Sequence, residues 1–127
     1  MVNFVGFDRG PHSGAALAVN STLRSQFPFA RVFRDGPIVE GSEQLSNILF
    51  FASEKEFQFS IPPHATFETE ECERTAGEFQ HWEIFTDAPM QPVITDARNP
   101  LARLQAPITA AHYEGMNQLL PPAVWIR

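Results

Sequence analysis

The sequence predicts an α/β fold with a sheet of about three strands, one helix that crosses between the first two strands, and a helical C-terminal extension. Three observations predict this fold. The chain has 127 residues, 43% of them apolar, which fits one domain that buries roughly two thirds of its unfolded surface. Short apolar runs typical of strands occur at residues 2–7, 29–34 and 47–53. A segment with helical periodicity separates the first two runs.

The N-terminal part predicts a strand, a turn and a helix. Residues 2–7 are apolar and rich in β-branched or aromatic side chains, as in a buried strand. The helix is predicted over residues of about 13–27, with Ser13 as its N-cap and Pro28 as its end. Its apolar positions recur every three or four residues, at Ala16, Val19, Leu23 and Phe27.

Two more strands are expected after this helix. Residues 29–34 alternate apolar side chains with polar or small ones. Residues 47–53 are the most hydrophobic stretch, so we expect them at the centre of the sheet. A crossover helix joins parallel strands, so the first two strands should be parallel. The third strand follows without a helix and should be antiparallel to the second.

The rest of the chain is less regular. Residues 54–127 are interpreted as an irregular and helical extension that packs on the sheet formed by residues 1–53. Alternation at residues 57–61 indicates an edge strand that Pro62 and Pro63 would end.

Two helices are expected in this extension. Residues 67–82 are helix-like, with acidic residues in the first turns. Pro107 is expected to open a last helix, which Pro121 and Pro122 would end. The candidates for the inward face of that helix are Ile108, Ala111, Met116 and Leu119. Both tryptophans, Trp82 and Trp125, are expected to be core or interface anchors.

The charge of the chain argues against binding to nucleic acid. The formal net charge is -6, so the basic patch that such a protein needs is missing. Nine acidic residues lie within residues 54–87, against Lys55 and Arg74. This acidic segment either attracts a cationic partner or substrate through its field, or is simply a solvated face. The sequence leaves both interpretations open.

The low cysteine content and the lack of long apolar runs predict a cytoplasmic protein. One cysteine, Cys72, excludes an intrachain disulfide and indicates a reducing compartment. No apolar run approaches the roughly 18 residues that span a bilayer. The start of the chain also lacks the basic and long apolar stretches of a signal peptide.

The turn after the first strand carries no complete catalytic or phosphate-binding motif. Gly6, Gly10 and Gly14 could direct backbone N–H groups at an anion, but their spacing fits no phosphate-binding motif, and glycine also serves simply to turn the chain. Ser13 lacks the G-x-S-x-G pattern of a hydrolase nucleophile. The four histidines show no metal-ligand spacing, so we assign neither a metal site nor a catalytic residue.

Two stretches resemble the C-terminal half of polyamine aminopropyltransferases, the spermidine synthase family. Residues 2–53 contain VNFVGFDRGPHSGAALAVNSTLRSQFPFARVFRDG and then LSNILFFAS. In that family a late strand is followed by a helix ending in Phe-Pro and by two strands, the last of them apolar and inserted antiparallel. Residues 93–105, VITDARNPLARLQ, are similar to the tail of bacterial members. The resemblance implies a partial Rossmann-like sheet of the methyltransferase type.

The family transfers an aminopropyl group from decarboxylated S-adenosylmethionine to an amine such as putrescine. Its nucleotide-binding glycine turn and its catalytic Asp motif would both precede Met1. The resemblance therefore implies that this chain alone holds no cofactor and is inactive without a nucleotide-binding half. By position, the acids expected near the polyamine substrate are Asp8, Asp35, Glu40, Glu43 and, in the tail motif, Asp96.

Ordinary structural roles remain open for some of these acids. Asp35 with Gly36 also fits a common turn, and Asp96 before Pro100 also fits a cap. The Tyr-Pro type loop of the family is absent, and Asp-Gly-Pro-Ile-Val-Glu stands in its place at residues 35–40.

A second hypothesis needs no enzyme. The chain would be a non-catalytic domain that binds a protein partner, or a second copy of itself, through the strand at residues 2–7. An unpaired strand is an open edge unless something covers it. Both hypotheses predict association, and what covers this edge distinguishes them.

Overall fold

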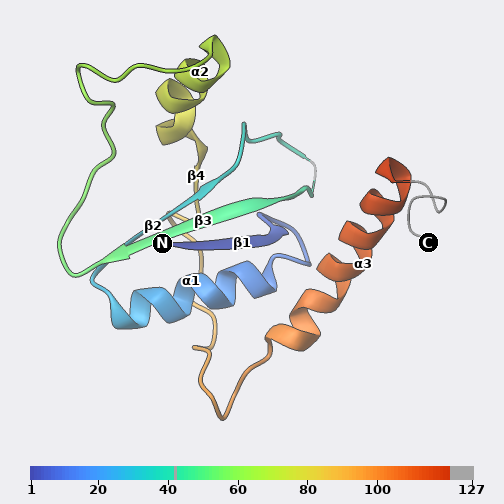
Figure 1. The fold of residues 1–127 in the computed structure, drawn as a ribbon. Coiled ribbons are helices and arrows are strands. Elements are labelled where there is room, and N and C mark those ends of the chain that lie inside the picture. Colours follow the sequence, from blue (N-terminus) through green and yellow to red (C-terminus); the bar gives the residue numbers. More distant parts are fainter. Residues whose placement is uncertain (42, 121–127) are drawn as a thin grey trace.

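A computed structural model describes residues 1–41 and 43–120 as a mixed α/β structure (Figure 1). The sheet contains four strands and is accompanied by three α-helices and one short 3-10 helix in the described residues. In chain order the elements are β1 (Val2–Phe7), α1 (Gly14–Gln26), β2 (Phe29–Arg34), β3 (Leu45–Ser53), α2 (Glu70–Glu78), η1 (Phe79–Trp82), β4 (Glu83–Ile84) and α3 (Leu101–Leu119).

The strands are ordered β1-β3-β2-β4, and every neighbouring pair is antiparallel. The most hydrophobic strand, β3, is central as predicted and pairs with β1 from Val2↔Phe50 to Phe7↔Leu45. Because β1 and β2 are both antiparallel to β3, they run in the same direction, which confirms that part of the prediction. The Rossmann-like expectation needs correction, because the described sheet contains no parallel neighbours and has a fourth strand.

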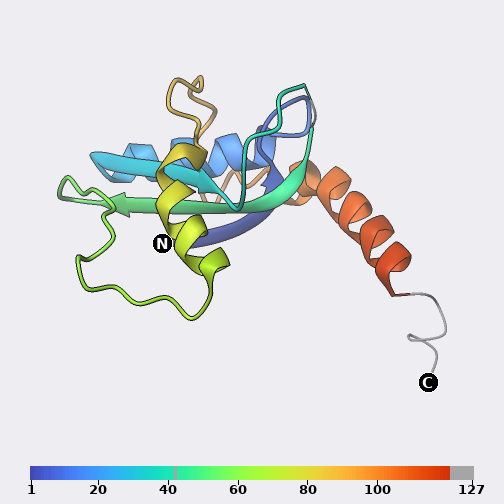
Figure 2. The same ribbon diagram turned by 90° about the horizontal axis from the view of Figure 1, so that it is seen from above.

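One face of the sheet packs against α1, and Figure 2 shows this helix above the sheet. Three small residues of the helix are buried and allow it to approach the strands closely: Ala15, Ala16 and Ala18. The core between these layers contains Val32, Ile48, Phe50 and Ile84, with Phe4 and Val19 packed against it.

Helix α1 begins where the sequence predicted, but the predicted capping hydrogen bond is not formed. Ser13 occupies the N-cap position, but its side chain makes no capping hydrogen bond. Its Oγ instead donates to the carbonyl oxygen of Gly10 at 2.8 Å, inside the turn that leads to the helix. Phe27 is the C-cap, so the helix ends before Pro28 as expected.

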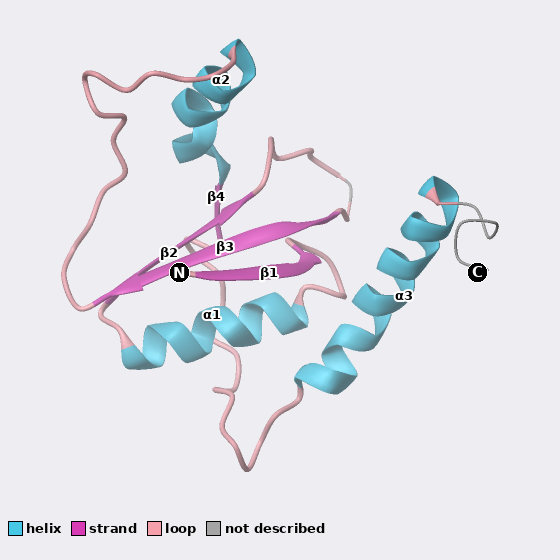
Figure 3. Ribbon diagram, viewed as in Figure 1, coloured by secondary structure: helices cyan, strands magenta, loops and turns pink. Residues whose placement is uncertain are grey.

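Aromatic side chains from the long loop after β3 and from η1 cover the opposite face of the sheet. Figure 3 shows the course of this loop, in pink, from β3 to α2. Phe33 stacks on Phe79 with ring centroids 4.5 Å apart and meets Phe59 edge-on at 5.3 Å. Phe51 also meets Phe59, at 4.6 Å. Such aromatic pairs stabilise a core beyond the area that they bury.

The edge strand predicted at residues 57–61 is wrong. These residues form no strand, because the rings of Phe57 and Phe59 contact each other and Phe59 packs on the sheet face. The alternation therefore reflects aromatic packing, not strand pairing. The helix expected at residues 67–82 is confirmed in part, as α2 followed by η1. Trp82 is buried as expected, and Trp125 lies outside the described residues.

The last helix begins earlier than predicted. Pro107 lies inside α3, which starts at Leu101 after Pro100 at the N-cap position. The side chain of Asn99 accepts a hydrogen bond from the Leu101 amide at 3.1 Å and so helps to start the helix. The predicted inward face is also only partly correct, since Ile108 is 5% exposed but Leu119 is 77% exposed. The expected end at Pro121 and Pro122 lies outside the described residues.

The connection between β4 and α3 crosses the outer side of α1. The hydroxyl of Ser21 accepts from the amide of Gln91 at 2.7 Å, and the hydroxyl of Thr22 accepts from Ile94 at 2.9 Å. These two hydrogen bonds hold the connection against α1. They thereby position the segment that leads into α3. Among the described residues, no helix has the length and apolar content needed to cross a membrane.

Candidate functional site

The carboxyl ends of β1 and β2 lie at the same edge of the sheet, because both strands are antiparallel to β3. Asp8 follows β1, and Arg34 and Asp35 end and follow β2. Ligands of open α/β sheets commonly bind at such an edge, outside the strand ends. We therefore take this edge as the candidate functional site.

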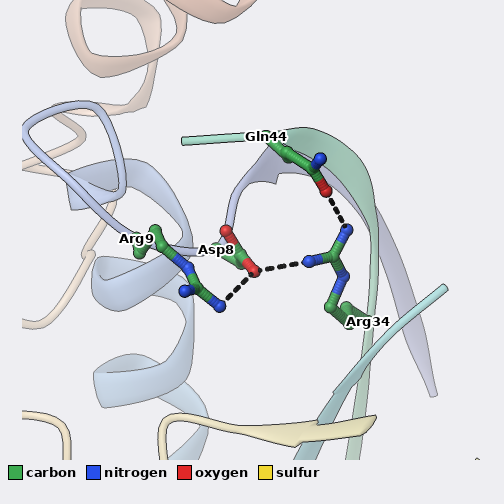
Figure 4. A network of polar contacts seen from close by, with 4 residues as sticks. All are labelled: Asp8, Arg9, Arg34 and Gln44. Atoms are coloured by element: carbon green, nitrogen blue, oxygen red, sulfur yellow. Dashed lines mark hydrogen bonds and ion pairs between the residues drawn. The ribbon is translucent and has the colours of Figure 1, made fainter. Parts of the chain in front are cut away.

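A buried ion pair occupies the centre of this edge (Figure 4). Arg34 donates from Nη1 to Oδ2 of Asp8 at 3.0 Å, and their side chains are 6% and 0% exposed. Arg34 also donates from Nη2 to Oε1 of Gln44 at 3.0 Å, and Arg9 reaches the same Asp8 oxygen at 3.3 Å. Because both side chains are buried, each charge needs the other as its partner. A buried charge without a partner is strongly unfavourable.

Two polar atoms of this pair are buried without a hydrogen-bond partner among the described residues. They are Oδ1 of Asp8 and Nε of Arg34. Asp8 was expected to face a substrate crevice, but its carboxylate is buried and bound by two guanidinium groups. In this arrangement Asp8 braces the strand end, and its carboxylate does not face solvent.

Glu43 closes the turn that follows β1. Its Oε1 accepts from the backbone N–H of His12 at 3.0 Å and lies 3.0 Å from Nδ1 of the same residue. Gly10 has φ +77°, and a Cβ at this position would lie 2.9 Å from Glu43 Oε1. Glycine therefore suits this position for two reasons: it adopts a positive φ without strain, and it has no Cβ that would collide with Glu43.

An acidic cavity of about 450 Å³ lies between the loop after β2 and α2. Asp35, Glu71 and Glu78 contribute three carboxylates, and Arg74 contributes one guanidinium. Trp82 forms part of the same wall. This acidic cavity has more negative than positive side chains, and it combines them with an aromatic surface, which suits an organic cation.

The structure brings only some of the expected site residues together. Asp35 lines the acidic cavity, and the amide of Asn47 donates to its carboxylate at 3.4 Å. Glu40 is exposed in the loop between β2 and β3. Asp96 is exposed in a turn closed by backbone hydrogen bonds of 3.0 Å between Thr95 and Arg98.

Sequence reasoning missed the residues of α2 and the buried arginine. Glu71, Arg74 and Glu78 are three, four and seven positions apart, the spacing that places side chains on one helix face. That spacing was readable from the sequence. Arg34 gave no such signal, because an arginine at the end of an alternating strand is ordinarily solvated.

A second ion pair lies on the aromatic face of the sheet. Arg31 donates from Nε and Nη2 to the two carboxylate oxygens of Glu83 at 3.0 and 2.6 Å. The hydrogen bonds that Arg31 donates to Glu83 raise the pKa of Arg31 above its ordinary value, although partial burial opposes the shift. The guanidinium also lies 5.0 Å from the ring centroid of Phe33. Arg31 is therefore fully engaged within the fold.

No cluster of three or more potential metal-ligating His, Cys, Asp or Glu side chains occurs in the part of the chain that the structure describes. Neither a family model, nor a curated protein, nor a solved structure matches this chain. The site must therefore be interpreted from its own chemistry.

Proposed function

We propose that this chain is the C-terminal part of a spermidine synthase-like protein, and that its acidic cavity contacts the polyamine substrate. The family reaction is aminopropyl transfer from decarboxylated S-adenosylmethionine to the amine. The chain alone would not catalyse this transfer, since it matches neither the nucleotide-binding turn nor the catalytic Asp motif of the family.

The observation that carries the proposal is the position of β3. The resemblance implies an apolar last strand that is inserted antiparallel, and the apolar strand β3 is antiparallel to both of its neighbours, β1 and β2. This insertion places Asp8 and Asp35 at one edge of the sheet. It also leaves β1 at the end of the sheet, where the strand of a nucleotide-binding half would pair with it.

The chemistry of the acidic cavity supports an amine ligand. Three carboxylates against one guanidinium leave an excess of negative charge for ammonium groups. Trp82 is a further lining residue, and a cation that reaches the face of an indole ring is attracted to it. Asp8 would act by fixing this edge, because Arg34 already holds its carboxylate.

The test is a spermidine titration of the full chain followed by two-dimensional NMR, at low and at high salt. We expect saturable shifts at Trp82 and at the amides of Asp35 and Glu78. Asp35→Asn and Glu78→Gln should each weaken binding, whereas Glu114→Gln, an exposed acid of α3, should not. Equal weakening by all three substitutions would show only unspecific attraction to negative charge and would refute the cavity assignment.

A second measurement addresses the missing half. Thermal unfolding with and without 5′-methylthioadenosine should give the same midpoint for this chain. A ligand at a hundred times its dissociation constant stabilises a native protein by about 2.7 kcal/mol, so binding would be easily seen. A clear shift would contradict the proposal that the nucleotide site lies outside this chain.

The edge position of β1 also supports a second candidate function, binding of a protein partner or of another copy without catalysis. Val2 and Val5 on this strand are 43% and 39% exposed, although both are apolar. Light scattering during gel filtration would test self-association, with Val5→Lys as the disrupting variant. A concentration-independent monomer would exclude a stable homodimer through this strand.

A further inference from the structure

A cavity of about 510 Å³ lies at the other end of β2 from the acidic cavity, where α1 ends and β2 begins. This volume is within the range of about 300–1,000 Å³ that is usual for small-molecule sites. Three phenylalanines are among its lining residues: Phe27, Phe29 and Phe57. Its charged lining residues are Arg24, Arg31 and Glu56. We call it the α1–β2 cavity.

Two of the three charges are not neutralised within the fold. Arg31 is paired with Glu83, as described above. Neither Arg24 nor Glu56 forms an ion pair with any described residue, including each other. The α1–β2 cavity thus presents one unpaired cation and one unpaired anion.

Arg24 is held in the wall of this cavity with most of its donors unused. Its Nη2 donates to the carbonyl oxygen of Phe85 at 3.4 Å, a long hydrogen bond. Its Nε is buried without a partner, and Nη1 makes no hydrogen bond to the described residues. Because Nε is buried, a ligand can use only Nη1 and Nη2, and these two nitrogens are enough to bind a carboxylate with two parallel hydrogen bonds.

The residue that accepts the hydrogen bond from Arg24, Phe85, lies outside the cavity lining and has an unusual backbone conformation. Phe85 has φ +62°, which is rare for a bulky residue and costs free energy. Its carbonyl oxygen is the acceptor that contacts Arg24, and its ring packs against the core. The surrounding structure thus maintains an unfavourable conformation at the residue that positions the guanidinium.

The arrangement of charges restricts the ligand class. A simple anion would be repelled by Glu56, and a simple cation by Arg24. A zwitterion satisfies both, with its carboxylate on Arg24 and its ammonium group towards Glu56 and the carboxyl end of α1, where helix dipoles favour positive charge. We infer that the α1–β2 cavity binds a hydrophobic α-amino acid, whose side chain contacts the three phenylalanine rings.

The test is calorimetric and NMR titration of the full chain with L-phenylalanine as the probe. Two comparison probes each lack one charge: 3-phenylpropionate has no ammonium group, and phenethylamine has no carboxylate. We expect L-phenylalanine to bind about tenfold or more tightly than either of them, because each loses a charge-assisted hydrogen bond. The shifts should centre on Phe27, Phe29 and Phe57.

Matched substitutions localise the binding. Glu56→Gln changes an exposed side chain and should not affect folding, yet should weaken binding about tenfold. Arg24→Gln should weaken it similarly, and Lys55→Gln, beside Glu56 but not in the cavity wall, should have no effect. Equal affinity for all three probes, or no saturable shift with a folded sample, would overturn the proposal. Asp35→Asn should leave this binding unchanged, which separates it from the proposed amine function.

Discussion

Arg34 and Asp8 connect two strands that are not neighbours in the sheet. β3 separates β1 from β2, yet Nη1 of Arg34 reaches Oδ2 of Asp8 at 3.0 Å beyond the strand ends. The pair ties the ends of β1 and β2 together, and Gln44 extends the connection to the start of β3. The candidate edge of the sheet therefore has a buried polar brace that holds three chain segments.

Removal of this brace on one side should destabilise the protein strongly. Arg34→Met leaves the buried Asp8 carboxylate with Arg9 alone, and we expect a loss of about 3–5 kcal/mol in the free energy of unfolding. Urea denaturation would measure it. Arg9→Met should cost less than about 1 kcal/mol, because Arg9 is a more exposed partner. Comparable losses for the two variants would contradict a special role of Arg34.

We expect glycine to be the only residue that position 10, in the turn after β1, accepts without a loss of stability. Gly10→Ala combines a strained φ of +77° with a Cβ 2.9 Å from Glu43 Oε1. Gly41→Ala, with φ +76° and no atom within 4 Å, carries the backbone strain without the collision. We expect about 1 kcal/mol for Gly41→Ala and clearly more for Gly10→Ala, measured by thermal unfolding. If Glu43→Ala in the Gly10→Ala background does not recover part of the difference, the collision is not its cause.

Phe79 should hold the loop after β3 on the sheet. Phe79→Ala removes the ring that stacks on Phe33, and we expect a loss of about 2–4 kcal/mol because the ring is partly buried. Limited proteolysis should then cleave within residues 54–69 faster than in the unchanged protein. Phe67→Ala is the control, since this side chain is 36% exposed and makes no ring contact among the described aromatics. Faster cleavage in the control as well would argue against a role specific to Phe79.

The start of α2 should depend on one hydroxyl. Thr69 Oγ1 accepts from the backbone amide of Cys72 at 3.2 Å, and α2 has no buried residue to stabilise it otherwise. Thr69→Ala should lower the local stability of this helix by about 1 kcal/mol, seen as faster hydrogen exchange of its amides. Thr69→Ser should retain most of the protection. An unchanged exchange rate in Thr69→Ala would show that packing, not capping, maintains α2.

The arrangement of the first three strands could be predicted because it rests on strong local patterns. The apolar run around Ile48 and Phe50 indicated a central strand, and helical spacing after β1 indicated the crossover. The two-residue strand β4 gave no pattern, since Glu83 and Ile84 are too short a stretch to alternate, and they follow η1 directly to pair with β2. Long-range packing decides such an element, and composition does not reveal it.

The candidate site was less predictable than the fold. Asp35 was identified by its place after a strand, and it does line a cavity. Asp8 was identified in the same way, but its carboxylate is paired with an arginine 26 positions later in the chain, a partner that no local pattern indicates. At Pro107 a local pattern misled the prediction. Proline is common at the start of a helix, but here the helix begins earlier, at Leu101, and Pro107 lies inside it.

The inserted position of β3 also constrains the order in which this protein can be synthesised and folded. Val2 pairs with Phe50 on β3, and β2 also pairs with β3. Neither β1 nor β2 can therefore form these ladders until β3 has been synthesised. During translation the apolar segments at residues 2–7 and 29–34 therefore leave the ribosome before their pairing strand exists. Pairing over such sequence separations is slow compared with local helix formation. Nascent chains that stall before residue 53 would then expose both strands to chaperones or to aggregation.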